Sequence, residues 1–239
     1  AGLSASIAGN VNANCIVATS KVTVATPTDG TSPYTYAFVQ NNVIPVASDY
    51  VVSNVGNLNP TINANWDVYV KDVNGCTSKL DVAVAKDPVP TVSASVINQC
   101  TASGSTFKIE AVGGSGVAPY TYTINTGVVP SPANTFTVAA GTYTITVKDS
   151  NGCTNTTSVT VSDAMTATAV LTKDLTCSVP VDGTITVTVA SGKAPFSYQV
   201  KIGAGAFSAA VPFAGNSFAY TASAANTYQF QITDANGCT

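Results

Sequence analysis

The sequence contains no histidine and no arginine, and Glu110 is its only glutamate in 239 residues. Without histidine, a catalytic triad or a metal site built on imidazole is excluded. With one glutamate, a mechanism that needs paired carboxylates would have to use aspartates. There is also no P-loop, dinucleotide-binding fingerprint or HExxH motif. We therefore expect a protein that is not an enzyme and has no catalytic residues, no cofactor and no metal site.

Charge and long apolar runs are scarce as well. Charged residues make up 9% of the chain, compared with roughly 25% in typical globular domains, and the net charge is −3. Because there is no basic patch, nucleic-acid binding is not expected. No apolar run approaches the roughly 18–20 residues of a membrane-spanning helix, so we expect no membrane insertion. A basic start followed by an apolar stretch, which is typical of a signal peptide, is also missing.

The sequence does contain a threefold internal repeat. The hexamer D-x-N-G-C-T occurs at 72–77, 149–154 and 234–239. A proline followed by aromatic residues precedes it each time, at Pro33, Pro119 and Pro195, and an earlier cysteine precedes that proline, at Cys15, Cys100 and Cys177. Three markers in constant order predict three copies of one structural unit. We place the units at residues 1–87, 88–163 and 164–239.

Each unit has the pattern of a β domain. The residues before every hexamer alternate between apolar and polar, as in Tyr143–Val147, and Trp66, Tyr143 and Tyr228 begin these runs. This period of two predicts half-buried strands, and about seven short strands per unit are typical of an immunoglobulin-like β-sandwich. We therefore expect an all-β tandem array that forms an extended rod. The third unit ends at its hexamer and lacks a final strand, so we expect the natural chain to continue or another chain to supply it.

The hexamer itself is predicted to be a hairpin turn between the last two strands. Asn-Gly favours the positive φ angles of a tight turn, and the aspartate is expected to accept hydrogen bonds from nearby backbone N–H groups. The predicted turn residues are Asp72, Asn74, Gly75, Asp149, Asn151, Gly152, Asp234, Asn236 and Gly237.

Six regularly placed cysteines predict disulfides and an oxidising, extracellular setting. Pairing within units would give Cys15–Cys76, Cys100–Cys153 and Cys177–Cys238. In a sandwich, however, the two cysteines of a unit would lie at opposite ends. An eight-residue strand spans roughly 26 Å, whereas disulfide Cα atoms lie within about 7 Å. A staggered pattern would give Cys15–Cys153 and Cys100–Cys238, with Cys76 and Cys177 pairing outside this segment. The sequence leaves both patterns open.

Three features together resemble the SprB repeat: the proline–tyrosine strand, the Gly-Thr-Tyr sequence at Gly141–Tyr143 that begins the next strand, and the hexamer. This repeat occurs in very large surface adhesins of Bacteroidetes, including proteins of gliding motility. The resemblance extends over all three units and is closest in the middle one. It implies export, through the type IX secretion route, to the bacterial cell surface, and a role as a stalk or adhesive filament.

Three functions follow from these patterns. The first is a structural stalk segment, because the spacing from Cys76 to Cys100 equals that from Cys153 to Cys177, which favours docked, nearly straight units. Its partners are neighbouring repeats of the same chain or other filament subunits. The second is a glycan-binding adhesin module that binds surface polysaccharide through loops of variable length. The third is a pilin-like subunit that polymerises by strand donation.

Overall fold

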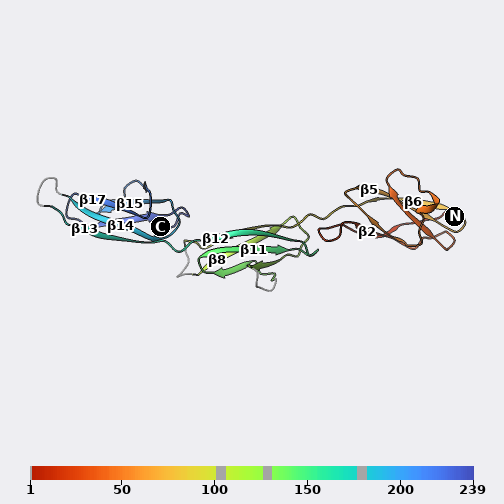
Figure 1. Cartoon of the computed structure of the whole chain (residues 1–239), viewed down its shortest axis with the longest axis horizontal. Coiled ribbons are helices and arrows are strands. Elements are labelled where there is room, and N and C mark those ends of the chain that lie inside the picture. The colour runs from red at the N-terminus through yellow and green to blue at the C-terminus, as the bar shows by residue number, and fades with distance from the viewer. Residues whose placement is uncertain (1, 101–105, 126–130, 177–181) are drawn as a thin grey trace.

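The computed structural model describes residues 2–100, 106–125, 131–176 and 182–239, and it folds into three β-sandwiches arranged end to end (Figure 1). The chain is all-β apart from one short 3-10 helix, η1 (Ala47–Asp49), within the described residues. Each sandwich consists of two three-stranded antiparallel sheets. The predicted immunoglobulin-like class is confirmed, but the described residues form six strands in each sandwich, whereas we expected about seven.

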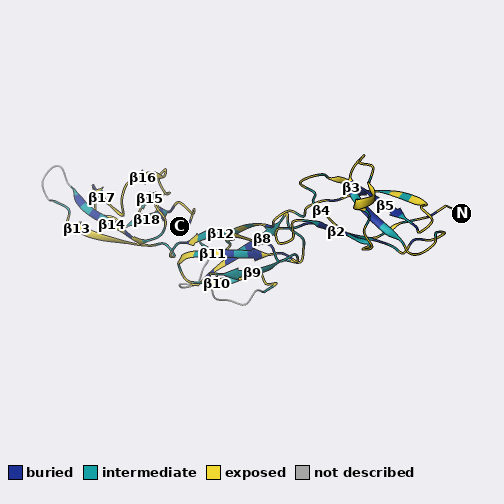
Figure 2. Cartoon of the chain, turned by 45° about the vertical axis from the view of Figure 1, so that its right-hand side comes forward, coloured by how far each residue is buried: buried dark blue, intermediate teal, exposed yellow. Residues whose placement is uncertain are grey.

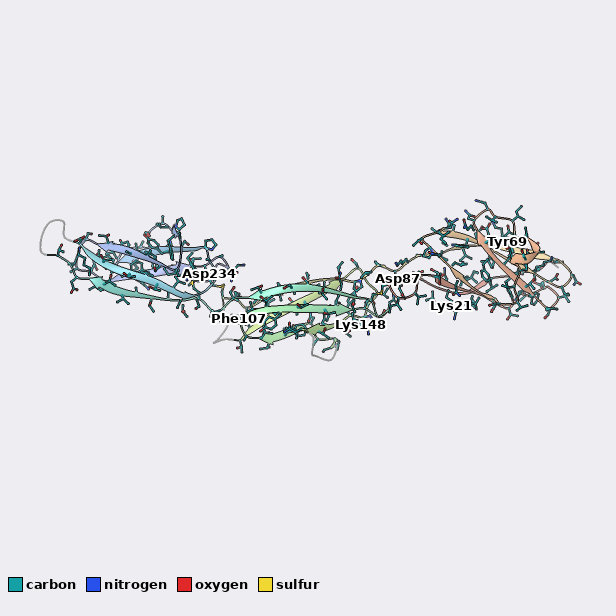
Figure 3. The ribbon with its side chains drawn as sticks, in the orientation of Figure 1. Lys21, Tyr69, Asp87, Phe107, Lys148 and Asp234 are labelled. Atoms are coloured by element: carbon teal, nitrogen blue, oxygen red, sulfur yellow. A yellow bond between two sulfur atoms is a disulfide. The ribbon has the colours of Figure 1, made fainter. Side chains whose placement is uncertain are left out.

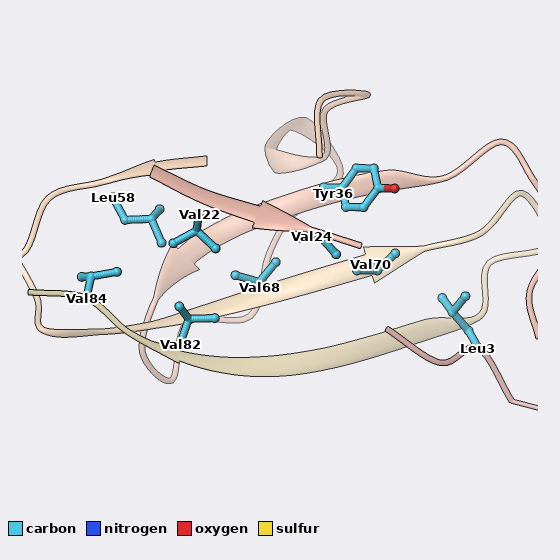
Figure 4. Close-up of a cluster of buried hydrophobic side chains, with 9 residues drawn as sticks. All are labelled: Leu3, Val22, Val24, Tyr36, Leu58, Val68, Val70, Val82 and Val84. Atoms are coloured by element: carbon cyan, nitrogen blue, oxygen red, sulfur yellow. The ribbon is translucent and has the colours of Figure 1, made fainter. Parts of the chain in front are cut away.

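The first sandwich pairs sheet β1-β2-β4 with sheet β3-β5-β6. Its strands are β1 (Ile7–Val11), β2 (Ser20–Val24), β3 (Thr35–Gln40), β4 (Val55–Leu58), β5 (Asn65–Lys71) and β6 (Thr77–Ala83). The alternation in β2 and β5 turns Val22, Val24, Val68 and Val70 into the space between the sheets, where all four are fully buried (Figure 4). The inward faces of the two sheets thus build the core from both sides.

The middle sandwich repeats this plan with sheets β10-β8-β7 and β12-β11-β9. Its strands are β7 (Thr91–Val96), β8 (Phe107–Gly114), β9 (Thr121–Ile124), β10 (Thr135–Val138), β11 (Gly141–Lys148) and β12 (Thr154–Val161). The last hairpin pairs Gly141 with Val161 and Lys148 with Thr154, so the hexamer at 149–154 is its turn. Phe107, Ile109 and Ile145 fill the core. Figure 2 colours the buried parts of the strands of this sandwich dark blue.

The third sandwich has sheets β13-β14-β17 and β16-β15-β18. Its strands are β13 (Thr166–Lys173), β14 (Gly183–Ser191), β15 (Phe196–Ile202), β16 (Val211–Phe213), β17 (Ser217–Ala222) and β18 (Tyr228–Thr233). β18 corresponds to β5 and β11, which each pair with strands on both sides, but among the described residues β18 pairs with β15 alone. Every residue of β13 is exposed, whereas alternate residues of β7 are half-buried.

Tyr143 near the start of β11 and Tyr228 at the start of β18 have matching environments. The Tyr143 hydroxyl donates to the Ala139 carbonyl at 3.0 Å, and the Tyr228 hydroxyl donates to the Ala224 carbonyl at 2.9 Å. Both tyrosines therefore reach the carbonyl four residues upstream and fix the entry to the strand, as in a tyrosine corner. Trp66 occupies the equivalent place in the first sandwich.

Candidate functional site at the junctions

The hexamer turns share one backbone geometry. In the middle sandwich the Gly152 N–H donates to the Asp149 carbonyl at 3.0 Å, and the Asp149 N–H donates to the Cys153 carbonyl at 3.0 Å. The glycines have positive φ, at 87°, 85° and 79° for Gly75, Gly152 and Gly237. The hexamer asparagines do not have positive φ, so the turn needs glycine at one position only. Our expectation that Asn-Gly as a pair would adopt positive φ is therefore wrong for the asparagine.

The hexamer aspartates are buried, and each bonds its own turn. Their exposed fractions are 6% for Asp72, 4% for Asp149 and 6% for Asp234. One carboxylate oxygen accepts the N–H of the hexamer cysteine. The donors and distances are Cys76 at 2.8 Å, Cys153 at 2.9 Å and Cys238 at 3.0 Å. In the middle and third sandwiches, where the hexamer cysteine is buried, the carboxylate thus satisfies a backbone donor that would otherwise have no partner.

The second carboxylate oxygen joins the turn to another loop. It accepts a backbone N–H two residues before the repeated proline. These donors are Thr31 at 3.2 Å, Val117 at 3.2 Å and Lys193 at 3.1 Å. In the opposite direction, the residue after each aspartate donates its N–H to the carbonyl of the same loop residue. The hexamer and the proline marker are therefore two sides of one contact that closes the same end of every sandwich.

Hydrogen bonding also sets the ionisation of Asp72. Burial raises the pKa of this carboxyl, but the backbone N–H groups of Thr31 and Cys76, with those of Asn74 and Gly75, outweigh it and lower the pKa below its ordinary value. The carboxylate is therefore charged at neutral pH, which is the form that accepts all of these bonds.

Two disulfides connect successive sandwiches in the staggered pattern. Cys15 bonds Cys153 with Cα atoms 5.8 Å apart, and Cys100 bonds Cys238 with Cα atoms 4.9 Å apart. Each bond therefore links the loop after the first strand of one sandwich to the hexamer turn of the next. The alternative pairing within units is not present, because these four cysteines form the two disulfides between sandwiches. Cys76 is free and exposed, and Cys177 lies outside the described residues.

A polar bridge supports the first junction. Asp87 lies between the first and middle sandwiches (Figure 3). Its carboxylate accepts the Asn12 side-chain amide at 2.7 Å from the first sandwich and the Asn151 amide at 2.8 Å from the hexamer of the middle one. We did not predict this role from the sequence. The only available signal was the position of Asp87 at a predicted unit boundary.

The second junction uses different contacts. The Gln99 side-chain amide donates to the Ser162 carbonyl at 2.7 Å, and its carbonyl oxygen accepts the Ser162 N–H at 3.3 Å. Asp163, which follows the middle sandwich as Asp87 follows the first, is exposed. Ile97 stands three residues before its cysteine, where the first sandwich has Asn12, so no amide is available to repeat the Asp87 bridge.

Other kinds of site are not found in the described part of the chain. Within residues 2–100, 106–125, 131–176 and 182–239, no group of three or more histidine, cysteine, aspartate or glutamate residues could hold a metal ion. The same ranges contain no helix with the length and apolar character needed to cross a membrane. The early cysteines and the hexamer cysteines meet at the junctions.

Residues 169–205 match the family model of the SprB repeat. The predicted resemblance is thus confirmed in the third sandwich, where the match runs from β13 to β15, although we expected it to be closest in the middle unit. No curated protein matches this chain.

Several solved structures resemble this chain at low identity. A bacterial 1.5-MDa ice-binding adhesin, in a study of its retention at the host cell surface, is 15% identical with a TM-score of 0.35, covering 100% of this chain and 95% of that one. A tetra-tandem repeat from the extending region of a large adhesion protein is 16% identical with a TM-score of 0.29, covering 99% and 71%. The first eight immunoglobulin domains of Down syndrome cell adhesion molecule are 13% identical with a TM-score of 0.30. The match to these immunoglobulin domains covers 77% of this chain and only 27% of the cell adhesion molecule.

Proposed function

We propose that this protein is a structural stalk segment of a large, secreted bacterial cell-surface adhesin or filament. The observation that supports it best is the pair of disulfides that bond each sandwich to the next across both junctions. Such bonds persist in the oxidising environment outside the cell. Each sandwich is one repeat unit of the stalk, with the boundaries 1–87, 88–163 and 164–239.

The contacts at the junctions suit a stalk because they limit bending. A disulfide and the Asp87 bridge constrain the first junction, and a disulfide and the Gln99–Ser162 pair constrain the second. With two attachments on each interface, a sandwich resists both hinging and rotation about the linker. The SprB repeat at 169–205 supports the rest of the proposal, which is export by type IX secretion and a role in surface attachment or gliding motility of Bacteroidetes.

Small-angle X-ray scattering tests the stalk. In oxidising solution we expect an elongated, nearly straight particle. Reductant should broaden the distribution of shapes while the far-ultraviolet circular dichroism of the sandwiches is retained, because it removes the covalent link at each junction before it affects the cores. A compact, bent particle in oxidising solution would contradict the stalk.

Strand donation is a second candidate function, supported by a groove in the third sandwich. Two adjoining cavities of about 470 and 460 Å³ lie between β13 and β18. Phe230 lines both, and Leu171 and Ala167 line one each. In the middle sandwich this space holds β12, which pairs with β11 and lies beside β7. We infer that the groove accepts an antiparallel strand with apolar side chains at alternate positions, such as Val159 and Val161 of β12.

A synthetic peptide with the sequence of residues 154–163 tests the groove in the intact chain. We expect it to slow amide hydrogen exchange in β18, because it would pair with the open edge of that strand. A control peptide with aspartate in place of Val159 and Val161 should not protect β18. Equal protection by both peptides, or by neither, would refute a strand-accepting groove. Concentration-dependent protection without peptide would indicate that a second copy of the chain fills it.

A further inference from the structure

We propose that the staggered disulfides make the segments between sandwiches into covalent tethers that carry tension past the sandwich interiors. This proposal rests on the stalk function and adds how such a stalk would withstand pulling. The shortest covalent path along the array passes through the disulfides and does not follow the polypeptide backbone throughout.

The first tether begins at the hexamer of the first sandwich. From Cys76 the backbone runs through β6, the linker and β7 to Cys100. The Cys100–Cys238 disulfide then crosses to the hexamer of the third sandwich. These two cysteines are 138 residues apart in the sequence, so the disulfide removes that whole stretch from the shortest path.

This tether is already close to fully extended in the folded protein. Strands β6 and β7 make up much of it, and strands rise about 3.3 Å per residue. The length of a fully extended polypeptide is at most roughly 3.3–3.6 Å per residue. These strands can therefore lengthen very little under tension. The linker between them contains Pro88 and Pro90, whose rings fix φ and limit local rearrangement.

A second tether overlaps the first. The Cys15–Cys153 disulfide leads from the first sandwich into β12, and the chain continues through the second linker into β13. β7 and β12 lie side by side in the middle sandwich, so the two tethers run next to each other there. The second tether ends at Cys177, which lies outside the described residues.

The other strands of the middle sandwich, β8 to β11, are off the first tether. The spacing of the repeated markers reflects this division. The interval from the repeated proline to the hexamer aspartate is shorter in the middle unit (119–149) than in the outer two (33–72 and 195–234), which are equal. The interval from the hexamer cysteine to the next early cysteine is the same both times (76–100 and 153–177). A segment that carries load must match the spacing of its two attachments, but loops away from the load can change length at little cost.

Single-molecule pulling between Cys76 and a handle after Thr239 tests the tether. Cys76 is free and exposed, and a Cys177→Ser background leaves it as the one unpaired thiol for attachment. With both disulfides intact, the path runs from Cys76 to Cys100 and from Cys238 to Thr239, so extension should stop at ~90 Å. The Cys15→Ser/Cys153→Ser variant should stop at the same length, because its missing disulfide is not on this path.

The Cys100→Ser/Cys238→Ser variant should extend several times further. Its shortest path runs back from Cys76 to Cys15, crosses to Cys153 and continues to Thr239. Its limit should therefore be roughly 500 Å. If the chain with both disulfides also extended as far as this variant, the tether would be refuted. An elongated particle in scattering together with that result would leave the stalk intact and remove only the tether.

Discussion

Replacing Asp149 with alanine is expected to destabilise the middle sandwich by about 3 kcal/mol, because one buried and one half-buried backbone donor lose their carboxylate acceptor. The side chain is 4% exposed and accepts the N–H groups of Cys153 and Val117. Bonds to a charged acceptor contribute about 1.5–3 kcal/mol each, and alanine leaves both donors without a partner inside the sandwich. Amide hydrogen exchange of β11 and β12, followed by mass spectrometry in the intact chain, measures this loss.

Asp163→Ala is the matched control, since it removes an aspartate that is exposed beyond the same sandwich. Its effect should remain within about 0.5 kcal/mol, as for most surface substitutions. Exchange in β5 and β6 of the first sandwich gives an internal reference in both variants. Equal protection of β11 in the two variants would show that the buried carboxylate does not hold the loops together.

Replacing Gly152 with valine is expected to cost the middle sandwich about 2–3 kcal/mol, because a β-branched residue is strained at positive φ. Gly152 has φ of +85°. A Cβ atom there would also lie 3.1 Å from Cδ1 of Ile16 in the first sandwich, so the substitution crowds the junction. Hydrogen exchange in β11 and β12 reports the strain, and scattering reports any displacement of the first sandwich.

Two further glycines separate these causes. Gly75 has φ of +87° with open space around it, so Gly75→Val should show strain in β5 and β6 without moving a junction. Gly9 lies in β1 with open space and no positive φ, so Gly9→Val should be nearly neutral. If Gly9→Val and Gly152→Val reduced stability equally, the turn geometry would not explain the repeated glycine.

Much of this structure follows from local sequence. Alternation with a period of two, as in Tyr143–Val147, is enough to predict a strand because each side chain must face either the core or the solvent. The hexamer between two such runs indicates a hairpin turn, and an aspartate at its start can bond the turn by local geometry. For the same reason, the all-β class and the threefold repeat could be predicted. The strand count could not, because β16 and η1 occupy segments whose sequence differs between units.

The repeat, the strands, the turn and the presence of disulfides could be predicted from the sequence, since each depends on residues close together in the chain. Which cysteines bond, and which residues the aspartates join, depends on how the sandwiches pack against each other. Cys15 and Cys153 are 138 residues apart, and they meet because one sandwich ends where the next begins. Asp87 could not be assigned from its neighbours, because its partners Asn12 and Asn151 come from two different sandwiches. A disulfide needs its Cα atoms within about 7 Å, and sequence spacing alone cannot supply that distance between separately folded units.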